Sequence, residues 1–295
     1  MTVNRTAPVA VRRGTTVEVV PLKHWGRLIG AAIAVAAVVA ILWVFATSRN
    51  VDWGAVFAYL PNADILSGLL VTLELTVLAM VLGAVLGTVL AVMRLSSNPV
   101  LRSVSTTYVW FVRSVPQLVQ ILFWFNIALF IPTLSIGGWS VSTNVVVTPM
   151  VAATLGLGLN EAAYMSEIVR AGILSIDPGQ REAASALGYR PGQIMAKIVL
   201  PQAMRVIIPP SSNEVIGMLK ATSLVSVIGA ADLLTRAQSI SSSNFKVIEL
   251  LFVASFWYIV ATTLASIGQY YLEKRFAVGS RAGRRPTKLR TETEQ

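Results

Sequence analysis

Residues 182–201 read EAASALGYRPGQIMAKIVLP, a polar and amphipathic stretch between two strongly apolar segments of a 295-residue chain. Residues 181–187 form an Ala-rich run that favours a helix, and Gly188 follows where a helix end accepts left-handed backbone angles. Pro191 and Pro201 suit the first turns of two further helical pieces. The stretch therefore predicts a helical elbow, hinged at Gly188, with a shape suited to docking into a groove of another protein.

The same residues carry a resemblance to a known family. They fit the EAA loop of ABC importer permeases, EAA-x3-G-x9-I-x-LP, without a gap. The matching positions are Glu182, Ala183, Ala184, Gly188, Ile198, Leu200 and Pro201. In that family the loop is a coupling helix that lies on a cytoplasmic ATPase subunit and transmits ATP-driven closure to the membrane domain. The alternative is an ordinary amphipathic surface helix at a membrane interface, and the number of matching positions favours coupling.

The composition indicates a membrane protein. The chain is 55% hydrophobic and only 13% charged, whereas soluble domains carry about 25% charged residues. Cysteine is absent and the single His24 lies in a basic N-terminal segment, which excludes disulfides and Cys- or His-based metal sites. No G-x4-G-K-[ST] motif occurs, so the chain has no P-loop for nucleotide phosphates. We therefore expect no enzyme activity and no cofactor in this chain, with ATP–Mg bound by separate subunits.

Hydropathy predicts an all-α polytopic bundle of about six transmembrane helices. The expected spans are residues 28–46, 65–93, 103–131 (kinked at Pro116), 148–174, a fifth beginning at Pro201 and interrupted at Pro209-Pro210, and 247–272, with an external turn at 137–139. The run 28–46 is long enough to cross a bilayer. A cleaved signal peptide is its alternative, but the run exceeds the usual apolar region and no A-x-A site follows.

These spans divide the chain into segments. The predicted segments are a basic cytoplasmic tail over 1–27, an additional helix over 28–46, a permease domain over 65–272 that contains the EAA loop at 175–201, and a basic cytoplasmic tail over 273–295. Orientation follows from the basic residues. With the N-terminus inside, Arg49, Lys220, Arg236 and Lys246 are the external ones among the 24 Lys and Arg residues. Since basic residues concentrate in cytoplasmic loops, both termini and the EAA loop are expected inside a bacterial cytoplasmic membrane.

Acidic residues within the spans are the candidates for a substrate pathway. A charge at the centre of a membrane helix costs about 2.5–3.5 kcal/mol on insertion scales, so it should face a cavity or a partner. We expect Asn160, Glu161 and Tyr164 to line a translocation cavity, with Asn213 and Glu214 opposite on the broken fifth span. Carboxylate, amide and phenol groups suit the ammonium and carboxylate of an amino acid.

Other readings of these polar residues stay open. Asn160, Tyr164 and Glu167 share one helix stripe, and a structural network between helices explains the set equally well. Glu167 and Arg170 are placed to form an ion pair at the cytoplasmic end of their helix. Arg113, near the start of the third span, needs the membrane interface or a partner.

Three segments narrow the resemblance to the polar amino acid permeases, the subfamily that serves histidine, glutamate, glutamine, arginine and opines. They are residues 156–188, the stretch from Asn213-Glu214 to Leu224 (with Ala221 where an acid or amide is usual), and Arg113 to Gln120 (with Ser114-Val115 departing from Gly-Thr). The resemblance implies a second permease, identical or paralogous, two ATP-binding subunits and an extracytoplasmic amino-acid-binding protein. Membrane lipid surrounds such a complex, and nucleic acid has no part in it.

Two rival classes remain. An ion-gradient-driven secondary amino acid carrier also has intramembrane carboxylates and broken helices, but no EAA loop. The other rival is a membrane scaffold that transports nothing. The polar residues along three spans argue against it, because a scaffold has no use for them.

Overall fold

The structure, a computed structural model, describes residues 25–136 and 138–277. The chain divides into two units, Met1–Val51 and Asp52–Gln295. In the first unit, α1 (Trp25–Ala46) is a helix of 22 residues. A helix is thus present over the predicted range 28–46 and begins three residues earlier, while its crossing of a membrane stays a prediction. The predicted tail over 1–27 lies outside the described residues except for its last three, and residues 278–295 of the C-terminal tail also lie outside them.

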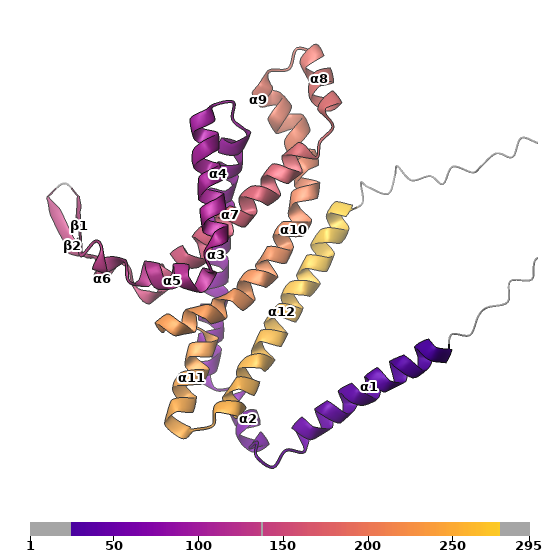
Figure 1. Cartoon of the computed structure of the whole chain (residues 1–295), viewed down its shortest axis with the longest axis vertical. Coiled ribbons are helices and arrows are strands. Elements are labelled where there is room, and N and C mark those ends of the chain that lie inside the picture. The colour runs from indigo at the N-terminus through magenta and orange to yellow at the C-terminus, as the bar shows by residue number, and fades with distance from the viewer. Residues whose placement is uncertain (1–24, 137, 278–295) are drawn as a thin grey trace, which may run out of the picture. The chain divides into compact units, whose positions relative to one another are not determined.

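The second unit is built almost entirely of helices (Figure 1). Its helices are α2 (Trp53–Tyr59), α3 (Ala63–Leu95), α4 (Pro99–Ser114), α5 (Gln117–Phe125), α6 (Thr143–Val146), α7 (Pro149–Leu174), α8 (Pro178–Ala186), α9 (Pro191–Ile194), α10 (Leu200–Ala221), α11 (Leu233–Asn244) and α12 (Val247–Ala277). Short 3-10 turns cover Ile127–Leu129 and Thr222–Ile228, and a π-turn covers Met195–Val199. The short helix α2 lies between the predicted spans 28–46 and 65–93.

A small hairpin is the exception to the all-α prediction. Strands β1 (Thr133–Ile136) and β2 (Trp139–Ser142) pair antiparallel, from Thr133 opposite Ser142 to Ile136 opposite Trp139. Gly138 has a φ of 90°, which is the left-handed region that glycine accepts at low cost. The turn predicted over 137–139 is therefore confirmed, except for residue 137, which lies outside the described residues.

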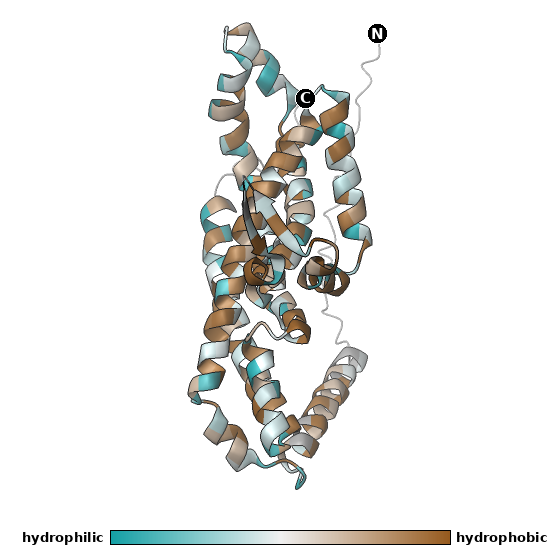
Figure 2. Cartoon of the chain, turned by 90° about the vertical axis from the view of Figure 1, so that its left-hand side faces the viewer, coloured by the Kyte–Doolittle hydropathy of each residue, from teal (hydrophilic) through white to brown (hydrophobic). Residues whose placement is uncertain are grey.

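Two helices of the described residues are long and apolar enough to cross a membrane, α3 and α12. A third candidate is the pair formed by Pro191–Ile228 and Leu233–Asn244, which is bent by 43°. Figure 2 shows that hydrophobic residues run along the long helices, while hydrophilic residues are most frequent near their ends. The chain is thus a multi-pass helical membrane protein; six separate spans stay a prediction.

The core forms where α7 packs against α3 and α5. Leu75, Ile121 and Leu157, one from each of these helices, are fully buried in it. Gly83 and Gly87 of α3 face α7, and a Cβ built on Gly83 would lie 2.4 Å from the Glu161 Cγ. The Gly-x3-Gly pair therefore lets α7 approach α3 closely.

Pro116 breaks the third predicted span as expected. Val115 has an extended backbone, with φ −96° and ψ 131°, because the proline ring disfavours a helical residue before it. The Gln120 side chain donates hydrogen bonds to the carbonyls of Val112 (2.8 Å) and Val115 (2.9 Å), so it satisfies groups left free at the end of α4. As a result α5 runs across the direction of α4 (Figure 1).

The prediction of a break at Pro209-Pro210 is wrong. Helix α10 continues from Leu200 to Ala221 with both prolines inside it. Both prolines have the φ that a helix requires, although each removes one backbone hydrogen bond. Helix α10 also packs against α7 and α12. The chain instead turns after Ile228, at Gly229, which has a φ of 70°.

Candidate coupling elbow and intramembrane polar sites

The predicted elbow is present as two short helices, α8 and α9. Asp177 begins α8 because its carboxylate accepts a hydrogen bond from the Gly179 N–H at 2.8 Å. Gly188 has a φ of 81°, and the Gly188 and Tyr189 N–H groups donate to the carbonyls of Ser185 and Ala184. This pattern of bonds back into the last turn of a helix is why glycine stands at the hinge.

The motif residues divide into an exposed and a buried set. Glu182 and Ala183 are exposed, whereas Ala184 is buried where α8 packs against α9 and the π-turn. Ile198 is half-buried, and Leu200 and Pro201 are exposed at the start of α10. Leu187 is 79% exposed and Tyr189 is 40% exposed. The elbow therefore presents an exposed side chain on each side of the Gly188 hinge.

Arg181 connects the elbow to the membrane-embedded core. Its guanidinium donates a hydrogen bond from Nη2 to the Ile173 carbonyl, near the end of α7, at 2.9 Å. Ile173 itself is buried with Val199 and Ala203, which belong to the π-turn and α10. The elbow is therefore joined to α7 by a hydrogen bond, at a point where α7, the π-turn and α10 pack together.

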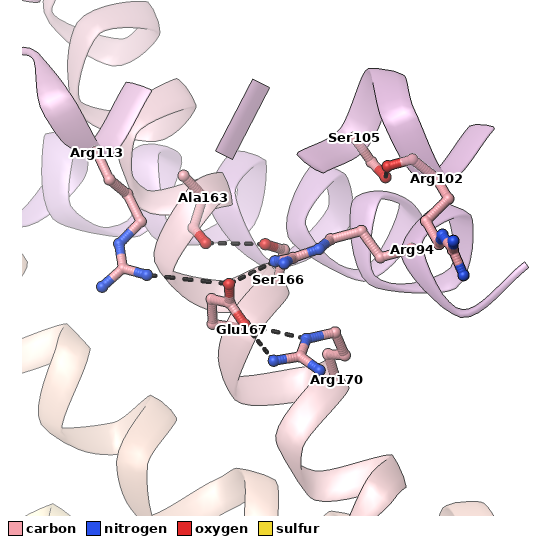
Figure 3. A network of polar contacts seen from close by, with 8 residues as sticks. All are labelled: Arg94, Arg102, Ser105, Arg113, Ala163, Ser166, Glu167 and Arg170. Carbon is pink, nitrogen blue, oxygen red and sulfur yellow. Dashed lines mark hydrogen bonds and ion pairs between the residues drawn. The ribbon is translucent and has the colours of Figure 1, made fainter. Parts of the chain in front are cut away.

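Glu167 is the centre of an ionic cluster (Figure 3). Its Oε2 accepts hydrogen bonds from the Nε and Nη2 of Arg170, at 3.1 and 3.0 Å, which confirms the predicted ion pair. Its Oε1 pairs with Arg94 of α3, and the Nη1 of Arg113 lies 4.0 Å away. The sequence did not identify Arg94 as a member of this cluster. The one hint of a cluster was that Arg113, within a predicted span, needs the membrane interface or a partner. The cluster joins α3, α4 and α7.

The predicted pathway residues fall into two groups. Tyr164 lies in the ionic cluster, where the Arg113 guanidinium stacks 4.9 Å from the centre of its ring. Asn160 and Glu161 are buried, and among the described residues the Glu161 Oε1 has no hydrogen-bond partner. Glu214 of α10 is close enough to Glu161 for their charges to interact, and it is half-buried. The adjacent Asn213 is exposed. The roles of these five residues in transport stay predictions.

Comparison with known proteins identifies a family. The model of the binding-protein-dependent transport system inner membrane component matches residues 79–278. The arginine transport system permease protein ArgU of Corynebacterium glutamicum is 43% identical over 269 residues, which are 90% of this chain and 84% of that protein. The glutamate/aspartate import permease protein GltK of Escherichia coli is 38% identical over 228 residues, 77% of this chain and 98% of GltK.

Solved structures agree with this assignment. A crystal structure of an amino acid ABC transporter with histidines contains a chain 35% identical to this one, with a TM-score of 0.67, over 76% of this chain and 99% of that chain. The inward-facing MetNI methionine ABC transporter, at 19% identity, shows the same fold with a TM-score of 0.59 over 72% of this chain and 95% of that chain. The chain belongs to the family of inner membrane components of binding-protein-dependent transport systems, the permeases of ABC importers, as its EAA loop predicts.

Proposed function

We propose that this chain is the permease subunit of an ATP-driven importer that carries a polar amino acid into the cell. The observation that carries the proposal is the exposed elbow α8–α9, whose Gly188 hinge and EAA residues suit contact with an ATPase subunit. The relatives ArgU and GltK, whose names refer to arginine and to glutamate and aspartate, support an amino acid as the substrate.

The partners follow from this role. Two ATP-binding subunits dock on the elbows of two permeases, identical or paralogous, and an extracytoplasmic binding protein delivers the amino acid. ATP–Mg is bound by the ATP-binding subunits, and this chain supplies no catalytic residue. The distribution of basic residues supports an orientation with both termini, and hence the elbow, in the cytoplasm. Coupling requires that the elbow contact differ in free energy between the inward- and outward-facing states.

Glu161 and Glu214 give a chemical basis for the substrate pathway. Two carboxyl groups from α7 and α10 lie near each other without a cation from the described residues paired to either. A transported amino acid brings an ammonium group, and some bring a cationic side chain, so the pair suits transient binding of that charge. Asn160, beside Glu161 in α7, and Asn213, beside Glu214 in α10, add amide groups to the proposed pathway.

The elbow is tested by placing a side chain on its hinge. Gly188→Ala forces a non-glycine residue into the left-handed region, which costs roughly 1–2 kcal/mol, and it should reduce transport and uncouple ATP hydrolysis from substrate. Gly192→Ala is the matched control, because Gly192 lies in the same elbow with no atom within 4 Å of a built Cβ and no positive φ. If both variants assemble and show the same transport and ATP hydrolysis as the wild type, the proposed coupling role of the elbow is contradicted.

A further inference from the structure

A cavity of about 350 Å³ opens beside the ionic cluster, within the range of about 300–1,000 Å³ found for small-molecule sites. Helix α4 supplies Thr106, Trp110 and Arg113, while α3 supplies Arg94 and α7 supplies Tyr164 and Glu167. The cavity is therefore lined by charged, aromatic and hydroxyl-bearing side chains from three helices that pack together.

The charges around this cavity do not balance. Three guanidinium groups, of Arg94, Arg113 and Arg170, surround the single carboxylate of Glu167 (Figure 3). Both oxygens of that carboxylate are already engaged by Arg94 and Arg170. The cluster therefore keeps a net positive charge, which attracts an anion to the cavity beside it.

Arg113 is the guanidinium with free donors. It lies 4.0 Å from the Glu167 Oε1, beyond a hydrogen bond, and its side chain is 45% exposed. Tyr164 holds it by a cation–π contact that leaves the N–H groups unused. Within the described part of the chain, neither Arg113 nor the Thr106 hydroxyl makes a side-chain hydrogen bond. A planar fork of free N–H groups is the geometry that binds carboxylate or phosphate oxygens in pairs.

We propose that this cavity binds an oxyanion through the Arg113 guanidinium, with Thr106 as a second donor and Trp110 and Tyr164 as its walls. The shared chemistry is a carboxylate or phosphate, and two sources supply it. One is the carboxylate of the amino acid in transit, which rests on the proposed function, and the other is the head group of an anionic lipid. Either one supplies the negative charge that the cluster lacks.

The test uses the assembled complex with its ATPase, in nanodiscs, and two arms. In the first, the lipid is phosphatidylcholine, and binding of labelled L-arginine and L-glutamate is compared with binding of agmatine and 4-aminobutyrate, which lack the α-carboxylate. In the second, the discs contain phosphatidylglycerol, and the anionic lipid retained by the purified complex is counted by native mass spectrometry. Arg113→Met removes the proposed group, and Arg102→Met, on an exposed residue of α4 outside the cavity, is the matched control.

A carboxylate site predicts that Arg113→Met binds the amino acid about tenfold more weakly, as expected for loss of one strong charged hydrogen-bond pair, while affinity for the decarboxylated analogue stays unchanged. A lipid site predicts instead that Arg113→Met loses retained phosphatidylglycerol and keeps amino acid affinity.

Arg113→Lys keeps the positive charge but lacks the planar pair of N–H donors, so it should weaken binding less than Arg113→Met does. It also provides a variant if Arg113→Met fails to assemble. The proposal is overturned if Arg113→Met and Arg113→Lys show the same amino acid affinity and the same retained phosphatidylglycerol as Arg102→Met. A wild-type complex without ATP-driven uptake would instead contradict the proposed function.

Discussion

Glu161 packs its side chain against Gly83 of α3, with Glu214 of α10 nearby. The sequence identified Glu161 as a carboxyl group whose position in a membrane helix needs an explanation. It could not identify Gly83 and Glu214 as its neighbours, because they come from helices about 80 and 50 residues away, and only the packing angle of α7 brings them together. Residue type thus predicted which polar residues are candidates for the substrate pathway. Only the fold shows that Tyr164 lies in the ionic cluster, apart from Glu161 and Glu214.

At the scale of one residue, Glu161→Gln separates charge from shape. If the carboxylate binds the ammonium of the substrate, uptake should fall by about tenfold or more, which corresponds to the ~1.5–3 kcal/mol of a charged hydrogen bond. Expression and basal ATP hydrolysis should hardly change. Glu273→Gln, which removes a charge at the end of α12, is the control. A parallel loss of folded complex and of uptake would support a structural network instead.

A second residue-scale prediction concerns the pair formed by Asp52 and Lys246, before α2 and α12. The hydrogen bond with Lys246 lowers the pKa of Asp52. Its stabilising effect is therefore present above about pH 4, the ordinary pKa of Asp, and is lost as the pH falls through the lower folded-state value. Asp52→Asn keeps an oxygen for the Ala55 N–H and removes the charge. The difference in melting temperature between this variant and the wild type should shrink at acid pH; a difference that does not depend on pH would contradict the assignment.

At the scale of elements, two proline sites show where sequence reasoning succeeds and fails. Pro116 ends α4 because Val115 becomes extended and Gln120 satisfies the freed carbonyls. Pro209 and Pro210 interrupt nothing, because α10 packs against α7 and α12. Proline removes a hydrogen bond in both cases, and tertiary packing decides whether the helix continues. The sequence shows where the prolines are, but it does not show how the helices that contain them pack.

The close contact between α3 and α7 gives the element-scale prediction. A Cβ on Gly87 would lie 2.6 Å from the Met165 Cβ and 2.9 Å from the Ala162 carbonyl oxygen, and a Cβ on Gly83 would meet Glu161. Gly83→Ala and Gly87→Ala should each destabilise the protein by about 1–3 kcal/mol, as overpacking does. Gly217→Ala in α10, where no atom lies within 4 Å, should not. Thermal unfolding of the purified protein gives the comparison, and equal melting temperatures in all three would mean that α3 and α7 lie farther apart than described.

At the scale of the whole molecule, the helical class, the EAA elbow and the family were predictable because they rest on local patterns. Hydrophobic runs, a seven-position motif and the placement of basic residues need no tertiary structure to be recognised. The ionic cluster was only partly predictable. Glu167 and Arg170 are neighbours on one helix, whereas Arg94 and Arg113 reach Glu167 from two other helices. The alignment of 269 residues with ArgU must include most of residues 28–46, while the role of this additional helix stays a prediction.

The central claim, ATP-driven amino acid import through this permease, is tested most directly by uptake into proteoliposomes. The complex of this chain, its ATPase and its binding protein is reconstituted with ATP on the ATPase side, and labelled arginine, glutamate and glutamine are offered on the other. We predict uptake of at least one of them that requires ATP hydrolysis and persists when proton and sodium ionophores collapse the ion gradients. Uptake that needs a proton or sodium gradient and proceeds without ATP would contradict the account.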